Sequence, residues 1–170
     1  ALFAMPLAGL WASGQTQSTV LSGLIQLTDA KLYYTEALGF LNGWDLPVFS
    51  ARRPLFPALL AVLLSITNHN LMVSLAILTG ITGLACYFTA REIQHTHGPE
   101  GAVFVLMVLF LFYRAHIGIS MSENLGVALG ALGFGLLWRG TSTKSILYIW
   151  SGLLITTLAL NARAGAFFIL

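Results

Sequence analysis

Residues 71–90 read LMVSLAILTGITGLACYFTA, a run of 20 residues without a charged side chain. The hydrocarbon core of a bilayer is roughly 30 Å thick and needs about 20 apolar residues in one helix. The polar stretch REIQHTHGPE follows directly, over residues 91–100. The sequence therefore predicts a membrane-spanning helix over Leu71–Ala90, closed by that polar stretch.

The composition of the whole chain agrees with a membrane setting. Hydrophobic residues make up 57% of the 170 residues, charged residues make up 8%, and the mean hydropathy is +0.84. A soluble domain carries about 25% charged residues, so water is excluded as the solvent of most of this surface. The net charge of +2 is spread thinly and gives no basic run for nucleic acid. The single cysteine, Cys86, excludes an internal disulfide and a cysteine metal cluster.

We expect an all-α fold, a polytopic bundle of transmembrane helices that forms a single membrane domain. Residues 1–13 are expected to be the end of a first span. Because the chain lacks an initiator Met and ends in an apolar stretch, the sequence indicates a fragment of a longer protein. After the first long run, the further expected spans are Gly101 to His116, Asn124 to Trp138 and Ser145 to Ala162, with a turn over 139–144 between the last two.

Residues 14–70 are expected to form an extracytoplasmic loop with short helices of its own. More than a third of all charges in the chain lie between Gly14 and Arg53. Within the loop, residues 28–39 read TDAKLYYTEALG, which predicts a short helix with Thr28 or Asp29 near its N-cap. The pair Asn42-Gly43 predicts where this helix stops.

The segment Pro54–Thr67 is apolar but short, and two topologies remain open for it. Its 14 residues reach only about 21 Å as a helix, which favours a re-entrant or interfacial helix. If the segment does not span, three Lys and Arg residues lie on one side of the membrane and five on the other. If it spans, the numbers are six and two. The positive-inside bias favours the second topology. We prefer the first, because it places Asp29 and Glu123 on one side of the membrane.

Asp29 and Glu123 are the two carboxylates of greatest interest. Both lie where a polar loop meets an apolar helix, and an acidic side chain is costly there unless it has a use. The alternative is structural: Asp29 caps the helix of the first loop, and Glu123 caps the span that follows, with Ser120 and Ser122 beside it.

Cations accompany the second carboxylate. Residues 113–124 read YRAHIGISMSEN, which brings Arg114, His116 and Glu123 to one membrane surface. The guanidinium groups of Arg114 and Arg53 are suited to phosphate oxygens, although either arginine could instead be an interfacial anchor. His95 and His97 are two residues apart in a polar stretch, a spacing that does not favour a metal site on a helix.

The order of these parts resembles the GT-C superfamily of membrane glycosyltransferases, which contains protein O-mannosyltransferases, the aminoarabinose transferase of lipid A and the oligosaccharyltransferases. The resemblance is carried by Asp29-x3-Tyr33-x3-Ala37 in a first loop, RPLFPALLA over residues 53–61, and Ser122-Glu123 after an arginine. It covers most of the chain, as the N-terminal half of such an enzyme.

The resemblance implies a transferase that moves a sugar from a polyprenyl-phosphate donor to a lipid, glycan or protein acceptor, with inversion at the anomeric carbon. Asp29 takes the place of the essential acidic residue of the first extracytoplasmic loop. Glu123 corresponds to a second acidic position, which in some relatives helps to hold a divalent metal. No cofactor is certain. The substrate-binding candidates are Tyr33, Arg53, Arg114, His116 and Arg163, the arginines for the lipid phosphate.

The implied location is a membrane, with the bacterial inner membrane as the expected one and the active site on its extracytoplasmic face. Two other functions remain open. A transporter or flippase half would also set polar residues against apolar spans. In a non-catalytic scaffold subunit, Asp29 and Glu123 would only be caps.

Overall fold

The computed structural model describes residues 1–13, 19–21, 23, 25–45, 47–51 and 53–164. Most of them are helical, which confirms the all-α part of the expected fold. A short antiparallel strand pair in the first loop was not predicted. The elements are α1 (Ala4–Ser13), β1 (Thr19–Val20), β2 (Ile25–Gln26), α2 (Thr28–Leu41), α3 (Val48–Ala51), α4 (Leu55–Ile66), α5 (Leu71–Tyr113), α6 (Ser122–Thr143) and α7 (Ile146–Ala164).

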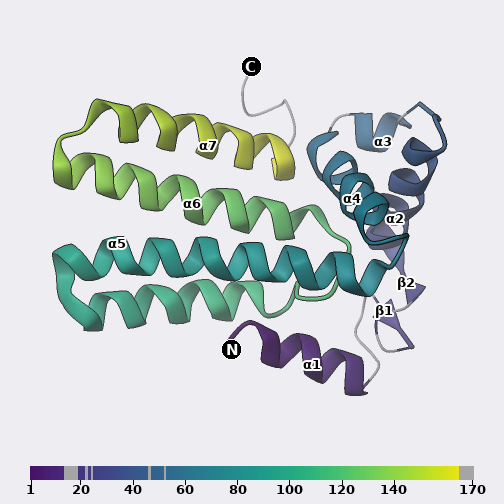
Figure 1. The fold of residues 1–170 in the computed structure, drawn as a ribbon, viewed down its shortest axis with the longest axis horizontal. Helices are drawn as coiled ribbons and strands as arrows, with labels where there is room; N and C mark the ends of the chain where they lie inside the picture. Colours follow the sequence, from purple (N-terminus) through teal and green to yellow (C-terminus); the bar gives the residue numbers. More distant parts are fainter. Residues whose placement is uncertain (14–18, 22, 24, 46, 52, 165–170) are drawn as a thin grey trace.

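The long helices lie side by side, and α5 itself doubles back (Figure 1). The reversal occurs at Gly98, which has a φ of 74°. Glycine adopts this conformation with little steric strain because it lacks a Cβ atom. Pro99 begins the returning arm. Cys86 of the first arm and Tyr113 of the second share one buried cluster. We call the end of the bundle near Tyr113 the proximal end and the end near Gly98 the distal end.

The two polar stretches at the distal end were expected as breaks between spans, and both contain the reversal, at Gly98 and after Thr143, although the helices extend further into them than expected. The helix continues from Leu71 through residues 91–97, and α6 continues to Thr143. The hydroxyl groups of Ser142 and Thr143 each donate 2.8 Å hydrogen bonds to backbone carbonyl oxygens of the preceding turn. Side chains that bond to the backbone in this way can lie within the last turn of a helix. The turn into α7 is therefore short and consists of Lys144, in the left-handed conformation, and its neighbour.

The described part of the chain contains one helix long and apolar enough to cross a membrane, namely α5; α4 and α7 are apolar but shorter. A polytopic arrangement is therefore a proposal and not a finding. The outer surface does favour a membrane setting, because large apolar side chains are exposed along the long helices in greater number than water tolerates. Exposed examples are Val73, Ile77, Ile81, Leu84, Val103, Phe104, Met107, Leu111, Ile146, Leu147, Trp150, Leu153 and Leu154.

Close approach of α6 and α7 depends on small residues. A Cβ at Gly133 would stand 3.0 Å from the Thr156 backbone nitrogen, and one at Gly152 would stand 2.8 Å from that of Leu137. Bulkier side chains would push the two backbones apart. Glycine at these two positions therefore has a packing role, whereas a Cβ at Gly130 would meet nothing within 4 Å.

The first loop folds against the proximal end. Helix α2 begins at Thr28 and gives way to Asn42 and a left-handed Gly43, as the sequence predicts. It packs against α4 through a buried cluster that also takes in the start of α5 (Figure 1). The fully buried members of this cluster are Tyr33, Ala37, Phe56, Leu60, Leu64 and Leu78.

Helix α4 lies beyond the ends of α6 and α7 at the proximal end (Figure 1). Its 12 residues extend about 18 Å, which is short of a bilayer core. We therefore expect Asn42 and Asn68, both exposed, to lie on the same side of a membrane. Cysteine substituted at each position in a Cys86→Ser background should react with an impermeant maleimide from one side only. Labelling from opposite sides would mean that α4 spans.

Gly118 allows the loop between α5 and α6 to pack closely against helix α1. Its φ is 78°, and an added Cβ would overlap the Leu10 side chain. We expect Gly118→Ala to lower the free energy of unfolding by about 1–3 kcal/mol through strain and overpacking. Gly43→Ala is the matched control, because Gly43 has the same φ of 78° and its added Cβ would meet nothing within 4 Å. Equal melting temperatures for the two variants would contradict a packing role.

Candidate functional site

At the proximal end, the loop before α6 is tied to the start of α2. The backbone N–H and the hydroxyl of Ser120 each lie 3.1 Å from Gln26 Oε1, and the hydroxyl lies 2.7 Å from the carbonyl oxygen of Ala30. Gln26 in turn donates to the Gly23 carbonyl at 2.9 Å. These buried bonds hold the region around Asp29 next to the region around Glu123.

A second connection runs through side chains alone. The Tyr33 hydroxyl donates to Ser122 Oγ at 3.4 Å, and the Ser122 hydroxyl donates to Glu123 Oε2 at 3.3 Å. Tyr33 is 2% exposed and Glu123 is 8% exposed. The ring of Tyr33 also meets Phe56 of α4 edge to face, with centroids 5.2 Å apart. The structure thus brings two of the predicted site residues, Tyr33 and Glu123, into one buried chain of polar groups.

Asn124 shapes the turn that presents Glu123. The Tyr113 hydroxyl donates to Asn124 Oδ1 at 2.7 Å, and Asn124 Nδ2 donates to the carbonyls of Ile119 and Met121 at 2.5 and 3.2 Å. Asn124 is 1% exposed. We call Gln26, Tyr33, Ser120, Ser122, Glu123 and Asn124 together the Glu123 cluster.

Neither carboxylate stands at an N-cap position. The N-cap of α2 is Leu27 and that of α6 is Met121, and no side-chain cap bond is formed at either position. Asp29 is exposed in the first turn of α2, and its side chain makes no hydrogen bond or ion pair within the described part of the chain. The alternative that Asp29 and Glu123 are N-cap residues is therefore not supported. An acidic group in the first turn of a helix still interacts favourably with the helix dipole.

The cationic candidates lie at the same end of the bundle. Arg114 follows the last turn of α5 and is exposed, and Arg53 is half-buried just before α4. His116 stacks on Phe112 with ring centroids 5.6 Å apart. Its Nδ1 atom is buried without a hydrogen-bond partner among the described residues, which marks it as available for another group. Arg163 belongs to the last turn of α7, and its side chain lies outside the described residues.

An apolar cavity of about 550 Å³ opens beside these residues, between the second arm of α5, α6 and α7. It includes Phe112, which stacks on His116, and Gly126, one turn along α6 from Glu123. Its lining is almost wholly apolar and continues along the helices to Gly130 and Thr156. The cavity is suited to a hydrocarbon chain whose polar end would lie near His116.

Several residues of the site gave no signal in the sequence. Gln26, Tyr113 and Asn124 belong to no recognisable functional motif. Only their burial and hydrogen bonds identify them as part of the site. Glu36 was also passed over: the Ser50 hydroxyl donates a hydrogen bond to its carboxylate, and partial burial raises the pKa of Glu36. Residues of this kind become visible only when the two segments are seen in contact.

The described residues contain no group of three or more His, Cys, Asp or Glu side chains that could hold a metal ion. The suggested metal at Glu123 therefore has no support from a ligand cluster in that part of the chain. Comparison with protein-family models, with curated proteins and with solved structures finds no match.

Proposed function

We propose that the protein containing these residues is a membrane glycosyltransferase of the GT-C kind. It would move a sugar from a polyprenyl-phosphate donor to an acceptor hydroxyl, with inversion, at the proximal end of a polytopic helical bundle. We place this end on the extracytoplasmic side of the membrane, which in a bacterium is the inner membrane. The observation that supports this proposal best is the buried connection from Tyr33 through Ser122 to Glu123, beside an apolar cavity.

The connection matters because it links two of the motif segments that suggested the function. Tyr33 comes from the first loop and Ser122-Glu123 from the start of α6, 89 residues away. Burying a carboxylate and a phenol together is costly unless their hydrogen bonds are used.

The reaction assigns a separate task to each group. The acceptor oxygen attacks the anomeric carbon and forms the new glycosidic bond, while the bond from that carbon to the phosphate oxygen breaks. The acceptor proton passes to the carboxylate of Asp29, and the electron pair leaves with the polyprenyl phosphate. Displacement from the opposite face inverts the configuration. Glu123, through Ser122 and Tyr33, would position the acceptor or the sugar.

The donor lipid has matching surroundings. Arg114 and Arg163 flank the proximal end of the cavity by their positions at the ends of α5 and α7, and their charge would stabilise the departing phosphate. The buried, unpartnered Nδ1 of His116 is a further group that could contact it. The apolar cavity would take the first part of the polyprenyl chain. Arg53 would contribute from the side of α4.

The transporter alternative is less well supported. Such a protein is expected to carry broken helices with charged groups at mid-membrane depth. In the described part of the chain, the one break inside a long helix is Gly98, at the distal tip, and the charged residues lie near the ends of α6, of α7 and of the two arms of α5.

The direct test is release of polyprenyl phosphate from a polyprenyl-phosphate sugar by the protein in lipid vesicles. Absence of release with a panel of sugars and acceptors would contradict the proposal.

Within this assay we expect Arg114→Ala to raise the KM for the donor by about ten- to 100-fold, because it removes a charged hydrogen bond to phosphate. Arg91→Ala, at the distal end, should leave donor use unchanged. Equal effects would mean that both arginines act through folding.

A further inference from the structure

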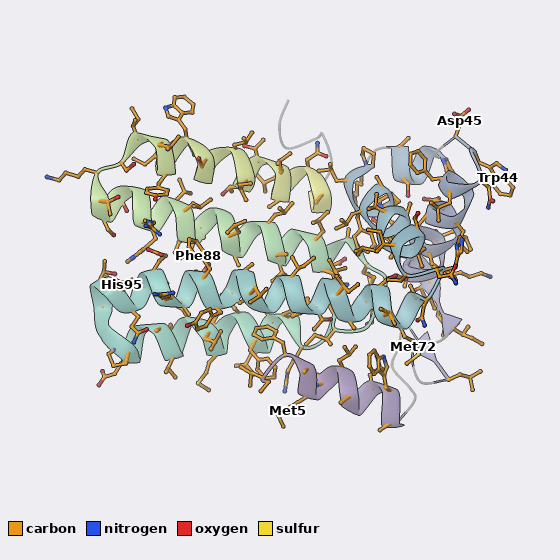
Figure 2. All side chains as sticks on the ribbon, viewed as in Figure 1. Met5, Trp44, Asp45, Met72, Phe88 and His95 are labelled. Carbon is orange, nitrogen blue, oxygen red and sulfur yellow. The ribbon has the colours of Figure 1, made fainter. Side chains whose placement is uncertain are left out.

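The distal end contains a second polar site that the proposed transfer reaction does not use. A cavity of about 420 Å³ lies between α5 and α6, and we call it the distal cavity. Phe88 and His95, which contribute to it from α5, are labelled near this end in Figure 2. Its charged and hydroxyl-bearing lining consists of Arg91, Glu92, His95, Arg139, Ser142 and Thr143, with Thr96 at its edge.

One of the two guanidinium groups is held in a fixed orientation. Arg139 Nη1 lies 3.3 Å from Glu92 Oε1, and Glu92 is only 12% exposed. The guanidinium carbon of Arg139 also lies 4.6 Å from the centroid of the Tyr148 ring. Because these contacts use one N–H and one face of the group, its other donors remain available to a ligand.

The second guanidinium belongs to Arg91 and has no ion-pair partner within the described residues. It is exposed, and it lies one helical turn before His95 on the same face of α5. The hydroxyl hydrogens of Ser142 and Thr143 are already donated to backbone carbonyls. Apart from His95, the free donors in the distal cavity belong to the two arginines. Two guanidinium groups face one carboxylate, and this excess of positive charge favours binding of an anion.

The surroundings indicate a ligand with an apolar part. Ile146, Leu147 and Trp150 are 72%, 70% and 67% exposed on the first turns of α7 next to this end. Trp138 lies nearby, with its indole N–H donating to Thr96 Oγ1 at 2.8 Å. Aromatic side chains at the ends of apolar helices are typical of the membrane interface, where basic pockets between helices bind anionic lipid headgroups.

We propose that the distal cavity binds the phosphate group of an anionic phospholipid, with Arg91 and Arg139 contacting the phosphate oxygens. The volume exceeds what a phosphate ion alone requires and leaves room for a glycerol headgroup. The headgroup would enter through the open side of the distal cavity, between α5 and α6. A free phosphate compound has the same recognition chemistry, so the test separates the two sources.

The test uses the full chain purified in a neutral detergent. Dihexanoyl-phosphatidylglycerol, dihexanoyl-phosphatidylcholine and inorganic phosphate are titrated in parallel, and tryptophan emission and the melting temperature are recorded. We expect phosphatidylglycerol to bind and to raise the melting temperature. Arg91→Gln should weaken this binding by about ten- to 100-fold and keep the lipid-free melting temperature of the wild type. Lys144→Gln is the matched control, since Lys144 is an exposed cation at the same end outside the cavity.

Three results would overturn the proposal. Equal losses for Arg91→Gln and Lys144→Gln would mean that the general positive charge of this end binds the lipid. Equal responses to phosphatidylglycerol and phosphatidylcholine would mean that hydrocarbon contacts dominate. Arg91-dependent binding of inorganic phosphate as tight as that of phosphatidylglycerol would assign the site to a soluble phosphate. Because the readout is binding and not sugar transfer, these results do not depend on the proposed enzyme activity.

Discussion

Asp29→Asn is expected to lower sugar transfer by about 10²- to 10⁴-fold, which is the usual contribution of a general base. The amide has nearly the shape of the carboxylate but cannot accept the proton of the acceptor hydroxyl. Asp29 is exposed and forms no hydrogen bond or ion pair within the described part of the chain, so the change breaks no contact there. The melting temperature should stay close to that of the wild type.

Asp45→Asn is a suitable control for this experiment, because Asp45 is a second exposed carboxylate of the first loop. Turnover of a polyprenyl-phosphate sugar and thermal unfolding should be measured on the same preparations. Transfer at the wild-type rate by Asp29→Asn would remove Asp29 from catalysis. Equal losses for the two variants would mean that the charge of the loop matters and not one base.

Asn124→Ala is expected to cause the largest loss of stability, about 2–4 kcal/mol in the free energy of unfolding. The substitution leaves the Tyr113 hydroxyl and the Ile119 carbonyl without the buried amide, whereas the Met121 carbonyl keeps the backbone N–H of residue 124. Each unsatisfied buried group costs about 1–3 kcal/mol. The melting temperature in detergent should fall, and transfer should fall with it because the turn that carries Glu123 loosens.

Asn42→Ala is the control for this prediction. Asn42 is exposed, and its amide makes one described hydrogen bond, to the Leu38 carbonyl at 2.9 Å. Its removal should change the stability by less than about 0.5 kcal/mol. If Asn124→Ala were as mild as Asn42→Ala, the loop before α6 would not depend on the buried asparagine.

The Glu123 cluster also separates the proposed functions. An enzyme needs its acidic groups near one another and near a place for the substrate. The bonds from Ser120 to Gln26 and to Ala30 draw the first loop onto the start of α6, and the apolar cavity lies one turn further along. We base the proposed transferase on this arrangement; in a scaffold, the two carboxylates would only need to stabilise separate helices.

Sequence alone was sufficient for the local features of this protein. The start of α2 at Thr28, its stop at Asn42-Gly43 and the long helix from Leu71 follow from short-range preferences and apolar runs, which act within a few residues of each position. The boundaries at the distal end were misplaced, because polar residues between 91 and 97 and between 139 and 143 read as turns when taken alone.

Only the tertiary structure decided which segments meet. Nothing in the local sequence distinguishes Gln26 or Asn124 from an exposed polar residue, and their role comes from burial against partners 94 and 11 residues away. The pairing of Arg139 with Glu92 is likewise set by the parallel packing of the first arm of α5 against α6. Periodicity and capping act over a few residues, whereas the cost of an unpaired buried polar group depends on the neighbours that the whole fold provides.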